Sequence, residues 1–305
     1  MDGIINILKP AGMTSMNVIS RVRRILSEKK VGHTGTLDPD VTGVLPIFAG
    51  KATRAIHYVQ DGGKSYSAEM VLGKSTSTQD GSGEVLSSAS CEATDVQVSE
   101  CLMNFVGKYI QIPPMYSAKK IDGKKLCDLA RKGIEVERRE HPVEIYSINI
   151  HAISRNALQN GDVEVKVKFE VDCSRGTYIR TLCNDVGVKL GCGGYMSWLE
   201  RTRSCGFSIL DGVSLEQLEK ALEDGNTDGV VSKTQSIFDY LPRIKINGVL
   251  RVDLLNGKTI DLVEELTLGL NTLFDDDDIF VGLCKVSIDE KTKTSKIKME
   301  RQFVI

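Results

Sequence analysis

The stretch of chain best suited to chemistry is Val31 to Gly43, VGHTGTLDPDVTG, which holds His33 and two aspartates, Asp38 and Asp40. Its apolar residues follow neither helical nor strand periodicity, so we predict a loop of defined backbone geometry. Pro39 fixes its own φ and biases Asp38 toward an extended conformation. Two interpretations are open at this point: a surface turn with a solvated acid, or a functional carboxylate on a loop that is anchored at both ends in a core.

Two other residues could assist a carboxylate. Tyr66 lies in the alternating run KSYSAEMVL, Lys64 to Leu72, which predicts a strand with Tyr66, Ala68 and Met70 on one face. The pattern alone favours a core tyrosine over a catalytic one. Arg180, in CSRGTYIR, falls one turn into a predicted helix and is most simply a surface residue. Its alternative use is to pair with an acid, because the guanidinium fork holds a carboxylate ionised and oriented.

Cationic side chains concentrate between residues 113 and 140, where acids are interleaved with them. The cationic residues of this basic segment are Lys119, Lys120, Lys124, Lys125, Arg131, Lys132, Arg138 and Arg139. One interpretation is a solvated helix-and-loop surface. The other is an RNA-backbone patch, in which lysine and arginine neutralise phosphates.

The composition excludes several classes of protein. The 305 residues are 41% hydrophobic and 26% charged, with a net charge of −2, so any nucleic-acid binding has to come from a local patch. The eight cysteines form no C-x-x-C pair, which excludes zinc ribbons and thioredoxin-like sites. Gly73-Lys74-Ser75 lacks the upstream glycine of a P-loop, since Ala68 stands there. With neither a signal peptide nor an apolar run of membrane-spanning length, we expect a cytoplasmic protein.

The elements that must position these residues alternate between strands and helices. We predict an α+β fold with a mixed, largely antiparallel central sheet flanked by helices. A small β-rich C-terminal domain follows, so that the domains are 1–240 and 245–305. The polar run 76–90 is predicted to be a loop, and Ser174 or Thr177 to cap the helix that begins near Tyr178. The expected strands are 3–8, 64–72, 144–153, 163–171, 246–252, 260–263, 279–288 and 295–305, and the expected helices start near residues 14, 99, 178 and 215.

Six segments, in this order, resemble the TruB family of tRNA pseudouridine-55 synthases. They are GIINILKPAGMTS, VGHTGTLDPDVTGVLPIFAGKATR, KSYSAEMVLG, PPMYSAKKIDGKKLCDLARKG, CSRGTYIRTL and LERTRSCGF. The resemblance spans about residues 3 to 220 and implies the pseudouridine-synthase fold and the isomerisation of uridine 55 in the T loop of tRNA to pseudouridine. The C-terminal segment is similar to a small PUA-type RNA-binding domain.

The resemblance also implies roles for individual residues. Asp38 matches the catalytic aspartate, Tyr66 the active-site tyrosine and Arg180 the arginine that pairs with the aspartate. Substrate-binding positions are His33, Gly35, Thr36, Lys64 and Leu199, and the RNA-contacting basic patch is Lys119, Lys120, Lys124, Lys125, Arg131 and Lys132. The carboxylate can attack the ribose, attack the base or act as the base that forms a glycal, and the sequence does not choose among these.

The expected partner is the T arm of tRNA, bound by a monomer without an obligatory protein partner, metal or organic cofactor. The alternative function is a non-catalytic protein that binds or folds tRNA. Two residues depart from the family pattern: Cys127 stands where many relatives carry tyrosine, and His141 where arginine precedes Pro-Val. Both departures concern RNA contacts and leave the chemistry untouched.

Overall fold

The computed structural model of the protein describes residues 1–59, 62–117, 119–121, 123–130, 132–134, 136–158, 161–262, 265–290 and 292–304. The strands of its largest sheet are β1 (Gly3–Lys9), β2 (Val31–His33), β3 (Thr42–Ala49), β4 (Lys64–Leu72), β7 (Gly107–Gln111), β10 (His141–Ala157), β11 (Val163–Cys173), β12 (Gly194–Ser204) and β13 (Phe207–Ser208). Their order is β1-β3-β12-β4-β11-β10-β7, with β2 beside β3 and β13 beside β12. The pairing of β3 with β12 is parallel and that of β12 with β4 antiparallel, which makes the sheet mixed. The predicted mixed central sheet is confirmed.

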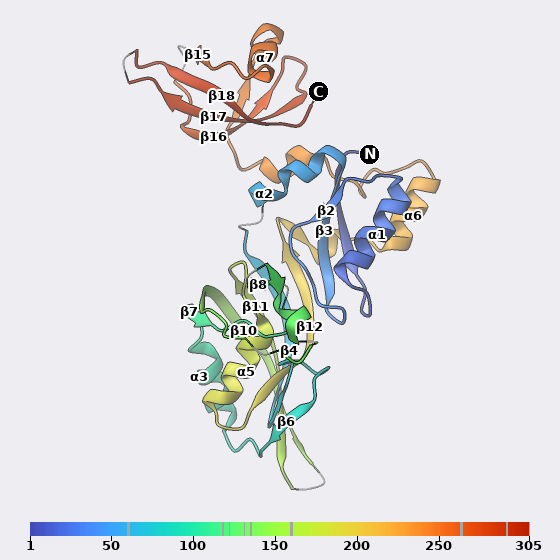
Figure 1. Cartoon of the computed structure of the whole chain (residues 1–305), viewed down its shortest axis with the longest axis vertical. Helices are drawn as coiled ribbons and strands as arrows, with labels where there is room; N and C mark the ends of the chain where they lie inside the picture. The colour runs from blue at the N-terminus through green and yellow to red at the C-terminus, as the bar shows by residue number, and fades with distance from the viewer. Residues whose placement is uncertain are drawn as a thin grey trace.

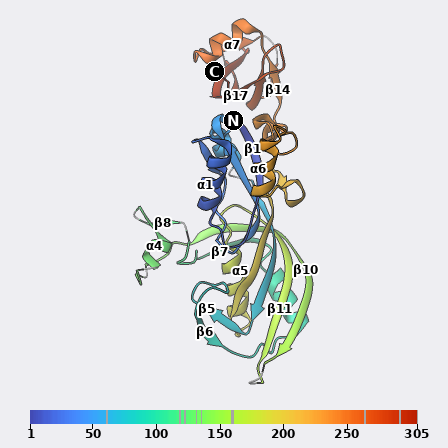
Figure 2. The same cartoon turned by 90° about the vertical axis from the view of Figure 1, so that its right-hand side faces the viewer.

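Helices cover this sheet in two groups (Figures 1 and 2). In one group, α1 (Ser15–Leu26) packs against α6 (Leu215–Glu223) beside the N-terminal strands. In the other, α5 (Ile179–Lys189) lies on β12 and β4, and α3 (Asp95–Met103) packs against α5 and β10. The remaining short helical segments of this part are η1 (Gly50–Ala55), α2 (Ile56–Val59), η2 (Ile209–Asp211) and η3 (Thr234–Phe238).

Local sequence signals explain how several of these elements begin. Thr14 caps α1, because its side chain accepts a hydrogen bond from the backbone N–H of Asn17. Ser214 caps α6 through a capping box with Gln217. On β4, Tyr66, Ala68 and Met70 are buried on one face, as the alternation predicts.

Four local predictions are wrong. Val31–His33 is not loop but the strand β2, paired with β3. The polar run 76–90 contains a hairpin of β5 (Lys74–Thr76) and β6 (Val85–Ser88). Helix α5 has Tyr178 at its N-cap without a side-chain cap, so neither Ser174 nor Thr177 caps it. The apolar run 246–252 is not a strand, because Asn247 caps a helix there, α7 (Gly248–Leu255).

The C-terminal part forms a separate five-stranded sheet at one end of the elongated molecule (Figure 1). Its strands are β14 (Arg243–Lys245), β15 (Ile260–Leu262), β16 (Gly269–Phe274), β17 (Phe280–Ile288) and β18 (Ser295–Gln302), in the order β14-β16-β17-β18-β15. The small β-rich C-terminal unit of the predicted fold is thus confirmed.

A cluster of aromatic rings joins this sheet to the rest of the chain. The ring of Phe238 lies 6.2 Å from that of Phe280 and 6.0 Å from that of Phe303, centroid to centroid. Ile4 and Phe48, from β1 and β3, are fully buried in the same cluster. The two sheets therefore share a core through this contact.

The basic segment has little regular structure in its described residues: β8 (Lys120–Ile121), β9 (Lys124–Lys125) and α4 (Leu126–Ala130). Arg131 lies outside the described residues, as do the side chains of Lys120, Lys124 and Lys125. Across the described part of the chain, no helix is long and apolar enough to cross a bilayer.

Candidate active site

A cavity of about 990 Å³ opens on the face of the central sheet between the Asp38 loop and the start of α5. Its lining includes Gly35, Thr36, Asp38, Lys64, Tyr66, Arg180, Leu199 and Arg201. Seven of these eight come from the residues that the sequence and the resemblance single out. The structure thus gathers side chains from the Asp38 loop, β4, α5 and β12 around one space.

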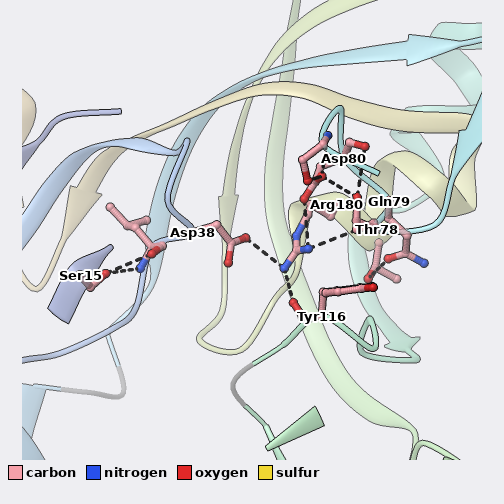
Figure 3. Close-up of polar contacts among 10 residues, drawn as sticks. Ser15, Asp38, Thr78, Gln79, Asp80, Tyr116 and Arg180 are labelled. Carbon is pink, nitrogen blue, oxygen red and sulfur yellow. Dashed lines mark hydrogen bonds and ion pairs between the residues drawn. The ribbon is translucent and has the colours of Figure 1, made fainter. Parts of the chain in front are cut away.

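Asp38 and Arg180 form an ion pair in this cavity (Figure 3). Oδ2 of Asp38 lies 3.0 Å from Nη2 of Arg180. The Arg180 side chain is only 6% exposed, whereas that of Asp38 keeps 44% of its surface exposed. Arg180 is therefore not the surface residue that its helical position suggested, and the carboxylate is reachable from the cavity.

Arg180 is itself held by contacts on its far side. Nη1 lies 3.1 Å from Oδ2 of Asp80, in the turn between β5 and β6, and donates to the Thr78 carbonyl at 3.2 Å. Nη2 also donates to the carbonyl of Tyr116 at 2.9 Å. Figure 3 shows the guanidinium between Asp38 on one side and the Thr78–Asp80 turn on the other. Two carboxylates thus share one buried cation.

The Asp38 loop is fixed from its other side by the N-terminal segment. Lys9, 1% exposed, donates from Nζ to the carbonyls of Pro10, Met13 and Pro39 at 2.6 to 2.8 Å. Ser15 Oγ accepts from the Leu37 N–H at 2.9 Å and lies 3.1 Å from the Leu37 carbonyl. Both residues that flank Asp38 in sequence are therefore hydrogen-bonded to the segment Lys9–Ser15.

Arg201 on β12 secures the glycine end of the same loop. It is 1% exposed, and it donates from Nε to the Val44 carbonyl at 2.7 Å and from Nη2 to the Gly35 carbonyl at 3.1 Å. Gly43 allows β12 to come this close: a Cβ built there would lie 2.2 Å from the Arg201 carbonyl oxygen, and its φ is +100°. Arg201 also lies beside Tyr66, its partner in the β4–β12 register.

Burial shifts the ionisation of the central groups. Burial raises the pKa of Asp38 above its usual 3.8, while the Arg180 guanidinium opposes this rise and Asp80 adds to it. Burial raises the pKa of Tyr66 to about 12, against the opposing charge of Arg201. Burial lowers the pKa of Lys9 to about 8, with Asp40 and Asp38 opposing. Tyr66 is thus a neutral phenol at pH 7.

The remaining predicted residues are placed in different ways. Lys64 and Leu199 line the cavity, and burial lowers the pKa of the Lys64 ammonium. His33 is half-buried and accepts a hydrogen bond from the Gly35 N–H through Nδ1 at 3.1 Å. It supports the Asp38 loop and is not among the side chains lining the cavity in the described structure. Lys119 of the basic segment lines the cavity, whereas Lys132 is exposed.

The cavity has a cationic lining although the chain as a whole is slightly acidic. Six Lys and Arg side chains face two carboxylates among its described lining residues. The cations are Lys64, Lys108, Lys119, Arg175, Arg180 and Arg201, and the carboxylates are Asp38 and Glu144. Such a concave cationic surface concentrates polyanions. In the part of the chain that is described, no cluster of three or more His, Cys, Asp or Glu side chains is arranged to hold a metal ion.

Sequence reasoning missed four residues of this site: Lys9, Ser15, Asp80 and Arg201. Lys9 and Ser15 lie in the motif KPAGMTS, so the resemblance located them without a role. Asp80 had no local signal, because its partner Arg180 lies 100 residues away in sequence. Arg201 lies in the matching segment LERTRSCGF, also without a role, and its burial depends on carbonyls of a distant loop.

Comparisons with known proteins identify the family of the chain. The N-terminal domain model of TruB family pseudouridylate synthases matches residues 23–179, and the C-terminal domain model of tRNA pseudouridylate synthase B matches residues 180–241. The tRNA pseudouridine synthase B of Alkaliphilus oremlandii is 46% identical over 260 residues, which cover 85% of this chain and 83% of that protein. The protein of the same name from Clostridioides difficile is 40% identical, with 100% of both chains covered.

Solved structures of similar fold include chains of two complexes. A chain of an H/ACA RNP bound to a substrate RNA containing 2′-deoxyuridine matches with a TM-score of 0.72 and 26% identity, over 99% of this chain and 85% of that one. A chain of a Cbf5-Nop10-Gar1 complex matches with a TM-score of 0.72 and 28% identity, with the same coverage. Family models, close relatives and fold together lead to one conclusion: this chain belongs to the TruB family of pseudouridylate synthases and is an isomerase.

Proposed function

We propose that this enzyme isomerises uridine 55 in the T loop of tRNA to pseudouridine, with Asp38 as the catalytic carboxylate. The ion pair of Asp38 with buried Arg180 is the observation that carries the proposal, because it presents one oriented carboxylate to a cationic cavity. The relatives named tRNA pseudouridine synthase B support tRNA as the substrate.

The reaction breaks the bond between ribose and the base nitrogen, rotates the uracil and rejoins it through carbon 5. An ionised Asp38 serves as the nucleophile or as the base, on the ribose or on the uracil. The target base has to leave its stack to enter the cavity, which costs a few kcal/mol, and a looped RNA lowers that penalty.

Tyr66 is suited to relay a proton, and not to act as a base that is already deprotonated. Its pKa of about 12 keeps the phenol protonated at neutral pH. Such a phenol takes up the proton leaving carbon 5 only while passing its own proton on. Leu199, in the cavity lining, supplies an apolar contact for the uracil ring.

We assign RNA contacts to the basic segment, with Lys119 nearest to the chemistry, and to the C-terminal sheet as a PUA-like module. The domains that we propose are 1–240 and 245–305. The enzyme is proposed to act in the cytoplasm, as a monomer without an obligatory protein partner.

The test is an assay of the purified protein on unmodified tRNA, with every pseudouridine mapped. Pseudouridine at position 55 alone is the expected result, and modification elsewhere would overturn the site assignment. A second candidate, a tRNA-binding or tRNA-folding protein without catalysis, requires binding with no modified base, and the same assay separates the two.

A further inference from the structure

The wall of the cavity that faces the Asp38 loop carries a group of side chains that the chemistry does not use. Lys119, His141 and Arg175 line this wall, from the basic segment, the first residue of β10 and the loop before α5. Three different elements thus bring a histidine and two cations into the lining of the cavity.

His141 is held in place by close packing. A Cβ built on Gly176 would lie 2.6 Å from Nε2 of the imidazole, and Gly176 has a φ of +81°. On its other side, the backbone of His141 pairs with Gln111 of β7. The imidazole is half-buried, so its position is set by the loop and the strand before any RNA arrives.

The charges around the imidazole favour its neutral form in the free protein. Burial lowers the pKa of His141, and Lys119 and Arg175 lower it further. The other charged lining residues of this wall are Lys108 and Glu144, which are cross-strand partners on β7 and β10. The charges of Lys119 and Arg175 therefore disfavour a third positive charge at His141 in the free protein.

An RNA phosphate placed here reverses the preference. Its negative charge neutralises the two cations and accepts a hydrogen bond from an imidazolium N–H. The pKa of His141 then rises on binding, and the imidazole takes up one proton from solvent. By linkage, an RNA that raises this pKa must bind more tightly as pH falls.

We propose that Lys119, His141 and Arg175 form a backbone-phosphate site, in which RNA binding and protonation of His141 are coupled. The proposal rests on the proposed function for the identity of the RNA. This site adds to the cavity an RNA contact whose strength depends on pH, beside the permanently charged lysines of the basic segment.

The experiment measures the dissociation constant of the full chain for a T-arm RNA hairpin between pH 5.5 and 7.5. Asp38→Asn is present in every sample, so that no turnover occurs during the titration. We expect affinity to rise about fivefold from pH 7.5 to pH 5.5 if the pKa rises by one unit on binding, because the full tenfold gain is reached only well below both pKa values. The slope of log K against log salt should steepen by about 0.7 to 0.9 at pH 5.5, as for one added phosphate contact.

Two matched variants isolate the imidazole from the other titrating groups. His141→Gln should bind like the unsubstituted protein at pH 7.5 and lack the gain at pH 5.5. His141→Arg, permanently charged, should bind at pH 7.5 as tightly as the unsubstituted protein does at pH 5.5. Calorimetry at pH 6.5 in buffers of different ionisation enthalpy should show proton uptake that His141→Gln loses.

Equal pH dependence of the unsubstituted protein and His141→Gln would overturn the proposal. That failure leaves the proposed function intact if the enzyme still forms pseudouridine 55. Conversely, the His141-dependent proton uptake in a protein that modifies no uridine supports the phosphate site and overturns the catalytic proposal.

Discussion

Two loops border the same cavity, and they are held in very different ways. The Asp38 loop is hydrogen-bonded to Lys9, Ser15 and Arg201, all three of which are buried. The basic segment, in its described residues, forms two strands of two residues each and a helix of five. The Tyr116 carbonyl of this segment accepts a hydrogen bond from Arg180.

The difference matches the roles that we propose for the two loops. A carboxylate that acts on a reacting carbon has to be positioned before the substrate binds, because misplacement by about 1 Å costs about 100-fold in rate. Charged contacts to an RNA backbone need little positional accuracy, because Coulomb attraction falls off gradually over several ångströms. The comparison predicts that damage to the first loop lowers kcat, whereas damage to the second weakens binding.

The largest effect is expected for Asp38→Asn. The amide keeps the shape but can neither attack nor accept a proton as a carboxylate does, so kcat should fall by about 1,000-fold or more. tRNA affinity should survive within a few-fold, as measured by filter binding. Asp40→Asn, in the same loop but exposed, is the matched control and should retain activity. Measurable turnover by Asp38→Asn would refute the role of the carboxylate.

The second effect tests the other loop. Replacing Lys119, Lys120, Lys124 and Lys125 together by serine should weaken tRNA binding about tenfold or more at physiological salt. The slope of log K against log salt should flatten by up to about 3, since each lost phosphate contact removes about 0.7 to 0.9. Single-turnover rates at saturating tRNA should stay near the original value. Unchanged affinity across the salt series would remove this segment from the RNA interface, and Lys220→Ser on α6 controls for a general loss of charge.

Lys9→Met tests whether the Asp38 loop depends on its anchor. The change leaves three carbonyl groups without their donor, so the free energy of unfolding should fall by about 3 kcal/mol. Because Pro39 follows Asp38, kcat should also fall about tenfold, while tRNA affinity changes little. Chemical denaturation and single-turnover kinetics measure the two effects. The exposed Lys29→Met should change neither, and a loss of affinity without a loss of rate would contradict the comparison.

The smallest effect is a shift in pH dependence. Activity requires ionised Asp38, whose pKa lies above 3.8, so the rate should fall as pH drops through that raised pKa. Asp80 contributes to the rise, and Asp80→Asn should therefore move the acid limb of kcat/KM to lower pH. Asp40 contributes less, so Asp40→Asn should move it by a smaller amount. An acid limb that stays in place or moves upward in Asp80→Asn would contradict this account of the shared cation.

The sequence predicted well those elements whose signals are local. Helix α1 follows from its cap Thr14 and its helical spacing of apolar residues, and β4 follows from strict alternation. The prediction of a strand at 246–252 was wrong because a short apolar run fits a strand and a buried helix equally well. The N-cap residue Asn247 makes this segment the start of a helix. The secondary structure of a segment is predicted without this ambiguity where the capping residue and the hydrophobic periodicity indicate the same element.

The site was predicted only in part, because its decisive contacts are long-range. Asp38 was identified by its motif, yet its geometry depends on residues 29 and 142 positions away, Lys9 and Arg180. Asp80 stood in a polar run without periodicity, and only the packing of the β5–β6 turn against α5 explains its contact with Arg180. The hydrophobic periodicity of a segment does not show which distant residue a polar side chain will contact.

The aromatic cluster around Phe238 has a consequence for how the molecule comes apart. Because β1 and β3 contribute to the same cluster as the residues after β18, loosening the C-terminal sheet exposes apolar surface on the strands that support the Asp38 loop. Arg54 adds a hydrogen bond to the Gln302 carbonyl at 2.9 Å across this junction. Heating should therefore melt both sheets in a single transition, and the shared core holds the C-terminal sheet, which we propose to contact RNA, at a fixed distance from the cavity.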